Sequence, residues 1–385
     1  MPSSALHGCP ESTGMETSAP RFAGRSRPLQ CDLPSPTPPP ELCMNRLLPF
    51  LVALLLLGCG TWGEGGGPAW IDRKAEAMDA TLEMSLEAPT LAAAVNASQA
   101  ALNAVGAADA LLSTKRPDSR VSELNAGTVG ATVGLDSVLC RVLAEVDRDA
   151  REVPGAFDMV IGSLVDVWNL DGDGRVPSVV ELEAARRASG NGGMQLDLER
   201  CVAQRLAAAA RLEPWGFMKG YSLRAARDSL LAHGVHSAQL KFGQQVVVFG
   251  PTEAGGPWRL AIPSLEDNRE EVFTLWLSDG SASTSSQSGR FVRAAGQAIG
   301  HILDPRTGTP TPGWGSLTVV AADPLRADVL STALFVLGPD SAYAWAERHN
   351  DVGVLILDRR DGAVRFQYNE GLRPALDSAT AAPIR

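Results

Sequence analysis

Two segments in the C-terminal third of the chain carry residue types suited to phosphate chemistry. Residues 300–308 (GHILDPRTG) place His301 beside a turn that a proline sets. Residues 327–338 (ADVLSTALFVLG) place Asp328 and Thr332 four positions apart in a predicted helix. Because residues four apart share one face of a helix, this carboxylate and this hydroxyl are expected to point the same way.

A carboxylate beside a hydroxyl is an oxygen pair of the kind that holds Mg²⁺, which takes one or two protein ligands together with water and substrate phosphate oxygens. Two other interpretations of the spacing stay open. An acidic residue in the first half of a helix also complements the helix dipole, and Thr332 among alanine and leucine can simply pack. His301 suits a general base, because free imidazole titrates near neutral pH, or it hydrogen-bonds its own loop.

The elements that must position these residues follow from apolar periodicity and from capping residues. Helices are predicted over residues 91–112, 222–233 and 324–337, the last with Asp323 as N-cap and Gly338 just past its end. Strands are predicted over residues 245–249, 258–262, 272–277, 317–321, 352–358 and 364–368. Helices and strands are interspersed without a regular βαβ order, so we predict an α+β fold of mixed sheets with flanking helices.

Composition excludes several classes of protein. The chain has 385 residues, of which 45% are hydrophobic, so it can bury a core and is not disordered throughout. Its 34 basic and 44 acidic residues give a net charge of -10. Attraction to a phosphate backbone therefore cannot bring this protein onto nucleic acid, and we predict no nucleic-acid partner.

The N-terminal region has the features of an exported protein. Residues 1–43 hold nine of the 26 prolines; we predict a disordered extension there and a translation start at Met44. An apolar run over residues 47–57 follows, too short to span a bilayer and typical of a secretory signal. The alternatives are a buried apolar helix and an N-terminal membrane anchor.

Residues 56–59 (LLGC) resemble the lipobox of bacterial lipoproteins, in which the cysteine becomes the lipidated first residue. We therefore predict a signal peptide over residues 44–59, lipidation of Cys59, a flexible tether over 60–75 and one catalytic domain over 76–385. The expected location is the cell envelope, where the lipid holds the protein on a bacterial membrane that faces the periplasm or the exterior.

Two further features leave alternatives open. Cys140 and Cys201 either pair in an oxidising envelope or remain two buried thiols. Residues 169–181 (NLDGDGRVPSVVE) resemble an EF-hand or dockerin calcium loop, but the closing glutamate falls at position thirteen rather than twelve. We favour a turn after Trp168 over a calcium site.

An ordered set of motifs resembles the ApbE family, the FAD:protein FMN transferases, over roughly residues 80–370. Besides the two C-terminal segments, the set consists of residues 112–125 (LSTKRPDSRVSELN), 155–168 (GAFDMVIGSLVDVW), 216–221 (GFMKGY) and 284–285 (TS). The resemblance implies a T-fold-like catalytic domain. It also implies a reaction in which a threonine or serine hydroxyl of an exported flavoprotein attacks the FMN phosphorus of FAD and AMP leaves.

The resemblance also implies roles for single residues. Mg²⁺ would be held by Asp328, Thr332 and the backbone carbonyl of Met218, and His301 would take the proton of the attacking hydroxyl. Contacts to FAD are expected from Ser119, Glu213, Lys219, Gly243, Thr284, Asp304 and Thr307. For some of these a simpler role stays open, because Lys219 can be solvated and Asp304, Arg306 and Thr307 can serve to fix their turn.

The chain departs from the family pattern around the nucleotide pocket. Where the family has Asp-Leu-Gly-Gly, residues 213–216 read Glu-Pro-Trp-Gly, and where it has Gly-Gly-Asp, residues 243–245 read Gly-Gln-Gln. The family's N-terminal Met-Gly-Thr has no clear counterpart; residues 83–85 lie near its expected place. Two other functions therefore remain alternatives, namely hydrolysis of FAD to FMN and AMP, and flavin binding without catalysis.

Overall fold

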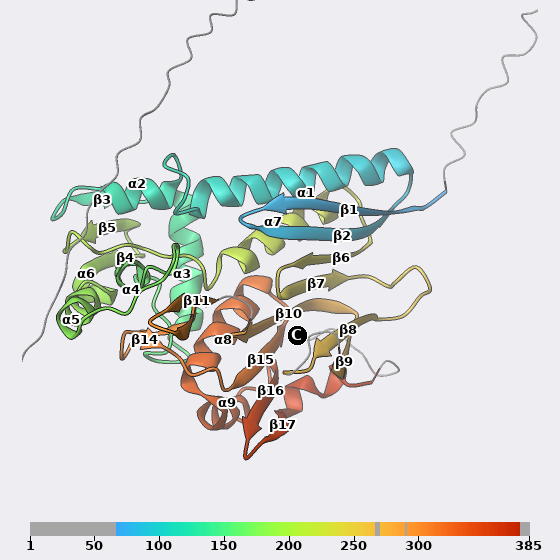
Figure 1. Ribbon diagram of the computed structural model, residues 1–385. Coiled ribbons are helices and arrows are strands. Elements are labelled where there is room, and N and C mark those ends of the chain that lie inside the picture. The colour runs from blue at the N-terminus through green and yellow to red at the C-terminus, as the bar shows by residue number, and fades with distance from the viewer. Residues whose placement is uncertain (1–66, 266–269, 289–290, 378–385) are drawn as a thin grey trace, which may run out of the picture. The chain divides into compact units, whose positions relative to one another are not determined.

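The computed structural model describes residues 67–265, 270–288 and 291–377 (Figure 1). The predicted extension over residues 1–43, the signal peptide over 44–59 and the lipidation site Cys59 lie outside the described residues. Within the described part of the chain, no helix combines the length and the apolar character that a bilayer crossing requires.

One eight-stranded sheet forms the centre of the described residues, and each of its strand pairs is antiparallel. In spatial order its strands are β1 (Ala69–Ala77), β2 (Ala80–Ala88), β6 (Ser237–Phe242), β7 (Gln245–Phe249), β10 (Asp279–Ser286), β15 (Gly315–Ala321), β16 (Gly353–Arg360) and β17 (Ala363–Tyr368). The predicted α+β class is confirmed, although the pairing within the large sheet is antiparallel where mixed sheets were expected.

Helices cover one face of this sheet. They are α1 (Leu91–Leu112), α7 (Met218–Ala232), α8 (Pro324–Leu337) and α9 (Pro339–Ala346). Helices α1 and α7 pack on the half made by β2, β6 and β7, and α8 and α9 pack on the half made by β15 and β16. The hairpin of β8 (Trp258–Pro263) and β9 (Glu271–Leu277) covers the opposite face together with the 3₁₀ turn Glu370–Ala375. Both faces are therefore buried in the middle of the sheet, whereas β17 and alternate positions of β1 and β2 stay partly exposed.

Smaller elements are attached beside the helical layer (Figure 1). They are α2 (Arg120–Ala126), β3 (Thr132–Gly134), α3 (Ser137–Ala150), α4 (Gly162–Trp168), α5 (Val179–Arg187), α6 (Gly190–Gly193), β4 (Met194–Asp197) and β5 (Val202–Arg205). Two short hairpins follow, β11 (Phe291–Ala294) with β12 (Gln297–Gly300), and β13 (Leu303–Asp304) with β14 (Thr309–Pro310).

The helix predictions that rest on local signals are confirmed. Helices α1 and α8 have the predicted bounds, and the Asp323 side chain accepts a hydrogen bond from the N–H of Leu325 at 3.2 Å, as an N-cap does. Helix α7 begins at Met218, four residues before the predicted start. Residues 69–75 of the predicted tether belong to strand β1, because the long antiparallel ladder with β2 orders them.

The calcium-like loop is closed by a helix cap. Ser178 is the N-cap of α5, and the Glu181 carboxylate accepts from the backbone N–H of Ser178 at 2.8 Å, which makes a capping box. Hydrogen bonds from Arg175 and Ser178 lower the pKa of Glu181 to about 2. Glu181, the acid that would have to close a calcium site, thus binds the N-terminus of its own helix instead. This agrees with the prediction of a turn after Trp168.

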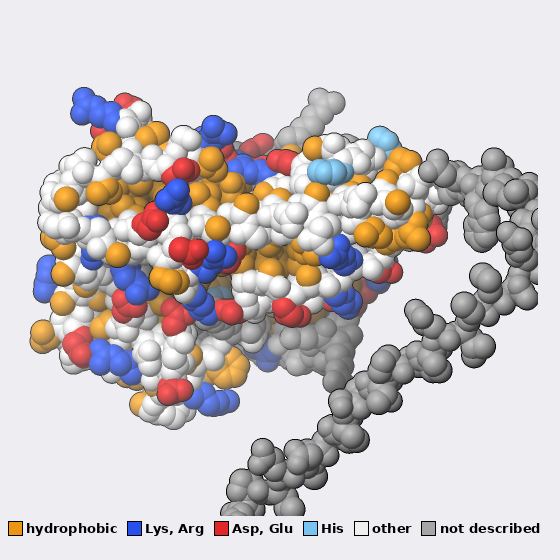
Figure 2. Space-filling view, turned by 90° about the horizontal axis from the view of Figure 1, so that it is seen from above, with side chains coloured by type: hydrophobic (Ala, Val, Ile, Leu, Met, Phe, Trp, Pro, Cys, Tyr) orange, Lys and Arg blue, Asp and Glu red, His pale blue; other side chains and the backbone are white. Residues whose placement is uncertain are grey.

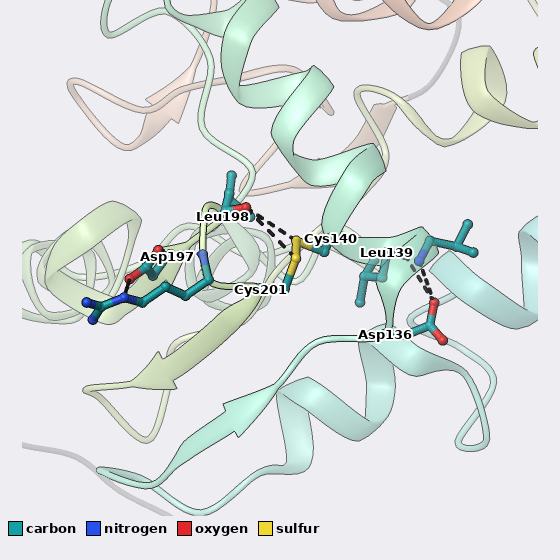
Figure 3. Close-up of a disulfide and its surroundings, with 8 residues drawn as sticks. Asp136, Leu139, Cys140, Asp197, Leu198 and Cys201 are labelled. Carbon is teal, nitrogen blue, oxygen red and sulfur yellow. Dashed lines mark hydrogen bonds and ion pairs between the residues drawn. A yellow bond between two sulfur atoms is a disulfide. The ribbon is translucent and has the colours of Figure 1, made fainter.

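Cys140 and Cys201 form a disulfide (Figure 3), which decides between the two alternatives for these residues. The bond ties α3 to the segment between β4 and β5, across 61 positions of sequence. Disulfides persist in oxidising compartments and are rare in the cytosol of most cells. The pair therefore agrees with an exported protein.

The surface seen from above, over α1, carries basic and acidic side chains that are interspersed rather than segregated (Figure 2). No continuous basic stripe crosses this face.

Candidate functional site

A cavity of about 530 Å³ lies where the starts of α7 and α8 meet the β6–β7 turn and strand β10. Its volume is within the usual range for cofactor sites. Seven segments contribute lining residues: residues 78–80, the end of α1 with residues 113–116, residues within 156–165 and within 213–219, residues 243–245, residues 283–286 of β10, and residues 301–303 with Pro305. Asp328 and Thr332 of α8 complete the wall.

The three residues on which the sequence interpretation depends share this cavity. Asp328 and Thr332 line it from one face of α8, and His301 lines it from the loop after β12. The helical spacing thus predicted their common direction correctly. Asp328 is 5% exposed, whereas His301 is half-buried.

The Asp328 carboxylate is held in place by backbone and hydroxyl donors. Gly220 donates its backbone N–H to Oδ2 at 2.8 Å, and the Ser283 hydroxyl lies 3.4 Å from Oδ1. Helices α7 and α8 approach so closely here that a Cβ on Gly220 would lie 2.5 Å from the carbonyl oxygen of Pro324. Glycine is therefore required at this position.

Burial raises the pKa of Asp328, while the charge of Lys219 and the bonds from Gly220 and Ser283 oppose that rise. A desolvated carboxylate of this kind gains stability from a cation placed against it. The described residues contain no group of three or more His, Cys, Asp and Glu side chains that could hold a metal. One carboxylate together with neutral oxygens is a donor set that suits Mg²⁺.

Neutral oxygens are present around this carboxylate. The hydroxyl of Thr332 lines the cavity from the same face of α8, and Ser283 and Ser285 line it from β10. Met218 also lines the cavity, and its carbonyl oxygen accepts from the Ser222 hydroxyl at 2.8 Å. The residues predicted to hold Mg²⁺ thus fit the ion in chemical type and lie around one space.

The loop that carries His301 is clamped by Gln287, a residue that the sequence analysis did not select. Its amide nitrogen donates to the carbonyl oxygens of Ile302 at 2.7 Å and Thr311 at 3.0 Å, and its amide oxygen accepts from the N–H of Ile302 at 3.1 Å. A Cβ on Gly300 would lie 2.1 Å from the same amide oxygen. Gln287 therefore fixes the backbone that follows His301 and leaves no room for a side chain at Gly300. Its partners are 15 and 24 positions away in sequence, so no local pattern reveals the clamp.

The predicted contacts to FAD divide into two groups. Glu213, Lys219, Gly243 and Thr284 line the cavity. Glu213 is 3% exposed and lies 3.9 Å from the Arg211 guanidinium. Gly243 adopts a φ of +61° at the β6–β7 turn, in the left-handed region that favours glycine.

Ser119, Asp304 and Thr307 are absent from the cavity lining. The Ser119 hydroxyl donates to the carbonyl of Ser113 and accepts from the N–H of Ser122, so it caps α2. Asp304 accepts from the Arg306 side chain at 2.8 Å, and the Thr307 hydroxyl lies 2.7 Å from that of Thr309. These side chains stabilise turns, and their contacts to FAD stay a prediction that the cavity does not support.

The β1–β2 turn also supplies lining residues. Met78 and Asp79 line it with φ values of +48° and +58°, the conformation of a tight hairpin turn. The predicted counterpart of Met-Gly-Thr at residues 83–85 lies instead within β2, paired on both sides. Residues 78–80 (MDA) line the cavity, whereas residues 83–85 do not.

Comparison with known proteins gives one consistent result. The model of the ApbE family matches residues 78–356, which is more than half of the chain. The FAD:protein FMN transferase of Haemophilus influenzae is 27% identical over 265 residues, which cover 66% of this chain and 77% of that relative. The FAD:protein FMN transferase of Salmonella typhimurium is 25% identical over 334 residues, which cover 84% of this chain and 95% of that relative.

Solved structures show the same fold. The apo form of the flavinyl transferase ApbE from Pseudomonas stutzeri matches with a TM-score of 0.71 and 26% identity, over 82% of this chain and 98% of that one. The ApbE protein from Thermotoga maritima matches with a TM-score of 0.73 and 23% identity, over 80% of this chain and 100% of that one.

Proposed function

The chain belongs to the ApbE family, and from that membership we propose that it transfers FMN from FAD to a threonine or serine hydroxyl of an exported flavoprotein, with release of AMP. The observation that carries the proposal is the convergence of Asp328, Thr332 and His301 on one cavity. Phosphoryl transfer needs mainly positioning and positive charge near the phosphate oxygens, and this cavity offers both.

Asp328, Thr332 and the Met218 carbonyl would hold Mg²⁺, which neutralises charge on the diphosphate when bound. Lys219 lines the same wall and adds a point charge that can pair with a phosphate oxygen. His301 accepts the proton of the attacking hydroxyl, and Gln287 keeps its loop in place. The oxygen–phosphorus bond to AMP breaks as the new bond to the acceptor oxygen forms.

The cell envelope is the proposed location, through a lipid on Cys59. The disulfide between Cys140 and Cys201 supports an oxidising compartment. Incorporation of labelled palmitate by cells that express the full chain is expected to disappear in the Cys59→Ala variant. Labelling that persists in this variant would remove the lipid anchor.

Incubation of the purified protein with FAD, Mg²⁺ and an exported flavoprotein tests the reaction. We expect an acceptor whose mass rises by one FMN residue and which fluoresces in a denaturing gel, together with one AMP for each FMN transferred. Free FMN with AMP and an unmodified acceptor would instead identify FAD hydrolysis. FAD that stays bound and intact would identify a flavin-binding protein without catalysis.

A further inference from the structure

Trp215 occupies a rigid position in the cavity wall. Glu213 donates its N–H to the carbonyl of Met159 at 2.8 Å, and the carbonyl of Pro214 accepts from Phe217 at 3.0 Å and from Met218 at 2.8 Å. The backbone on both sides of Trp215 is thus tied down. Such a segment can present a side chain to a ligand without a large cost in lost mobility.

Gly216 leaves this backbone no room to shift. A Cβ there would lie 2.7 Å from the ring of Phe157 and 3.6 Å from Cγ2 of Thr332. Trp215 is therefore the sequence neighbour of Gly216, which lies close to the predicted metal ligand Thr332. A group beside Trp215 would lie next to the place where the diphosphate is expected.

The side chain of Trp215 joins two environments. It is half-buried, packs against the apolar cluster that α4 and α5 form with the β11–β12 hairpin, and lines the cavity. Ile161, Val165 and Leu303 belong to or pack against the same cluster and line the cavity, together with the buried acid Glu213, whereas the wall around Asp328 carries lysine and hydroxyl groups. The cavity thus has an apolar end beside Trp215 and a polar end at α8, as a ligand with a flat ring and a charged chain requires.

His301 indicates which ring belongs at the apolar end. In a direct displacement at phosphorus, the attacking and leaving oxygens lie roughly in line, so the base stands opposite the departing AMP. Leu303, two residues after His301, lies in the same apolar cluster that Trp215 packs against. The apolar end is therefore on the side of the phosphorus away from the departing AMP, where the flavin ring is the remaining ring of FAD.

We propose that Trp215 is a specificity-determining residue that packs on the isoalloxazine ring of the FMN half of FAD, an inference that rests on the proposed function. A tryptophan supplies a large aromatic face at low entropic cost. The family pattern has glycine here, so this contact belongs to the present chain and not to the general pattern.

Calorimetry with FAD, FMN and ADP, each with Mg²⁺, tests the proposal on the wild-type protein and on Trp215→Gly, Trp215→Phe and Trp276→Phe. Trp276 lies on β9, is absent from the cavity lining and controls for the loss of an indole. We expect Trp215→Gly to bind FAD and FMN about tenfold more weakly, the scale of one aromatic contact, with ADP unchanged. Trp215→Phe should restore most of the affinity, and Trp276→Phe should match wild type.

Quenching of tryptophan emission by FMN gives a second readout, and its extent should fall in Trp215→Gly and stay in Trp276→Phe. Equal affinity of the wild type and Trp215→Gly for FAD and FMN would overturn the inference and leave the proposed function intact. A loss confined to ADP and FAD would place adenine beside Trp215 and would also overturn it. A wild-type protein that binds neither FAD nor FMN would remove the proposed function itself.

Discussion

The two ends of the cavity are built in different ways. At the α8 end, Asp328 is 5% exposed and receives its hydrogen bonds from the backbone of α7 and from strand β10. At the other end, Asp79 and Lys115 form an ion pair in which the side chains are 69% and 54% exposed, on a turn with two residues at positive φ. Packing fixes the position of Asp328, whereas solvent screens the charges of Asp79 and Lys115.

This contrast indicates where function is fixed and where the chain can vary. The matches to the family pattern at Asp328, Thr332 and His301 lie at the packed end or on a clamped loop. Of the departures, Trp215 lies on another part of the cavity wall, whereas Gln245 is fully buried and donates to the Pro324 carbonyl at the start of α8. We therefore expect substitutions at the packed end to reduce transfer strongly and substitutions at the exposed end to have small effects.

Asp328→Asn is expected to give the largest effect. It keeps the size of the side chain and its bond to Gly220, but it removes the charge that holds a cation. We expect FMN transfer to fall about 10³-fold, the scale for loss of one preorganised electrostatic group. Asp228→Asn, which changes an exposed acid of α7, is the control. Transfer rates from acceptor fluorescence measure the difference, and an active Asp328→Asn protein would remove the metal assignment.

His301→Gln should come next. The variant loses the group that accepts the proton, so we expect transfer to fall about 10²-fold, within the range for a general base. Binding of FAD and of Mg²⁺ should stay as in wild type, since neither contact depends on the imidazole. Exposed His233 on the end of α7, changed to glutamine, serves as control. Wild-type transfer by His301→Gln would leave the reaction without its proposed base.

Gln287→Ala tests the clamp behind His301. Removal of the amide leaves the backbone groups of Ile302 and a carbonyl of Thr311 without this partner, which costs about 1–3 kcal/mol of unfolding free energy when such groups stay buried. We expect kcat to fall while KM for FAD changes little. The pH profile of kcat should also shift, because the imidazole is displaced. A lower melting temperature with unchanged kcat and pH profile would make Gln287 a purely structural residue.

Asp158→Asn tests a buried carboxyl of the cavity wall. Burial raises the pKa of Asp158 in the folded protein, while the N–H of Val160 opposes the rise. Below the pKa of Asp158 in the unfolded chain, the protein has the full stability that the protonated side chain provides. This stability is lost as the pH rises through the pKa of Asp158 in the folded protein. We expect Asp158→Asn to melt a few degrees above wild type at pH 7 and at the same temperature in acid. If Asp158→Asn and wild type had equal melting temperatures at both pH values, this would contradict the expectation that burial of the Asp158 carboxylate lowers stability at pH 7.

Lys115→Ala is expected to give the smallest effect. Its ion pair with Asp79 is exposed, so its loss should change the unfolding free energy by less than about 1 kcal/mol. Transfer should change by less than about threefold at 0.15 M salt, where exposed charges are screened. A large loss of transfer would show that the exposed end contributes to catalysis. It would contradict the expected difference between the packed end and the exposed end.

Local signals predicted helices α1, α7 and α8 and strands β7, β8, β9, β15, β16 and β17, but not the other helices and strands of the described residues. The bounds of α1 and α8 follow from apolar periodicity and from capping residues within a few positions. The direction of Asp328 and Thr332 follows from helical spacing alone. Strand β2 was missed although Leu82, Met84 and Leu86 alternate with polar residues, which is the pattern of a half-buried strand.

The rest of the site depends on distant partners. The clamp at Gln287 and the close approach of Gly220 to Pro324 join residues that are far apart in sequence. The turn at Met78 and Asp79 uses non-glycine residues at positive φ, so it lacks the usual Asn-Gly signal of a tight hairpin. Ser119 shows the converse, because a serine within a family motif proved to be a helix cap outside the cavity.

Binding of Mn²⁺, followed by its electron paramagnetic resonance signal in the presence of FAD, tests the central claim most directly. The claim is that Asp328 and Thr332 hold a divalent cation in this cavity. We expect wild type to bind one Mn²⁺ per chain, Mg²⁺ to displace it, and Asp328→Asn and Thr332→Val to lose the site while the control Asp228→Asn keeps it. Equal Mn²⁺ binding by wild type, Asp328→Asn and Thr332→Val would contradict the account.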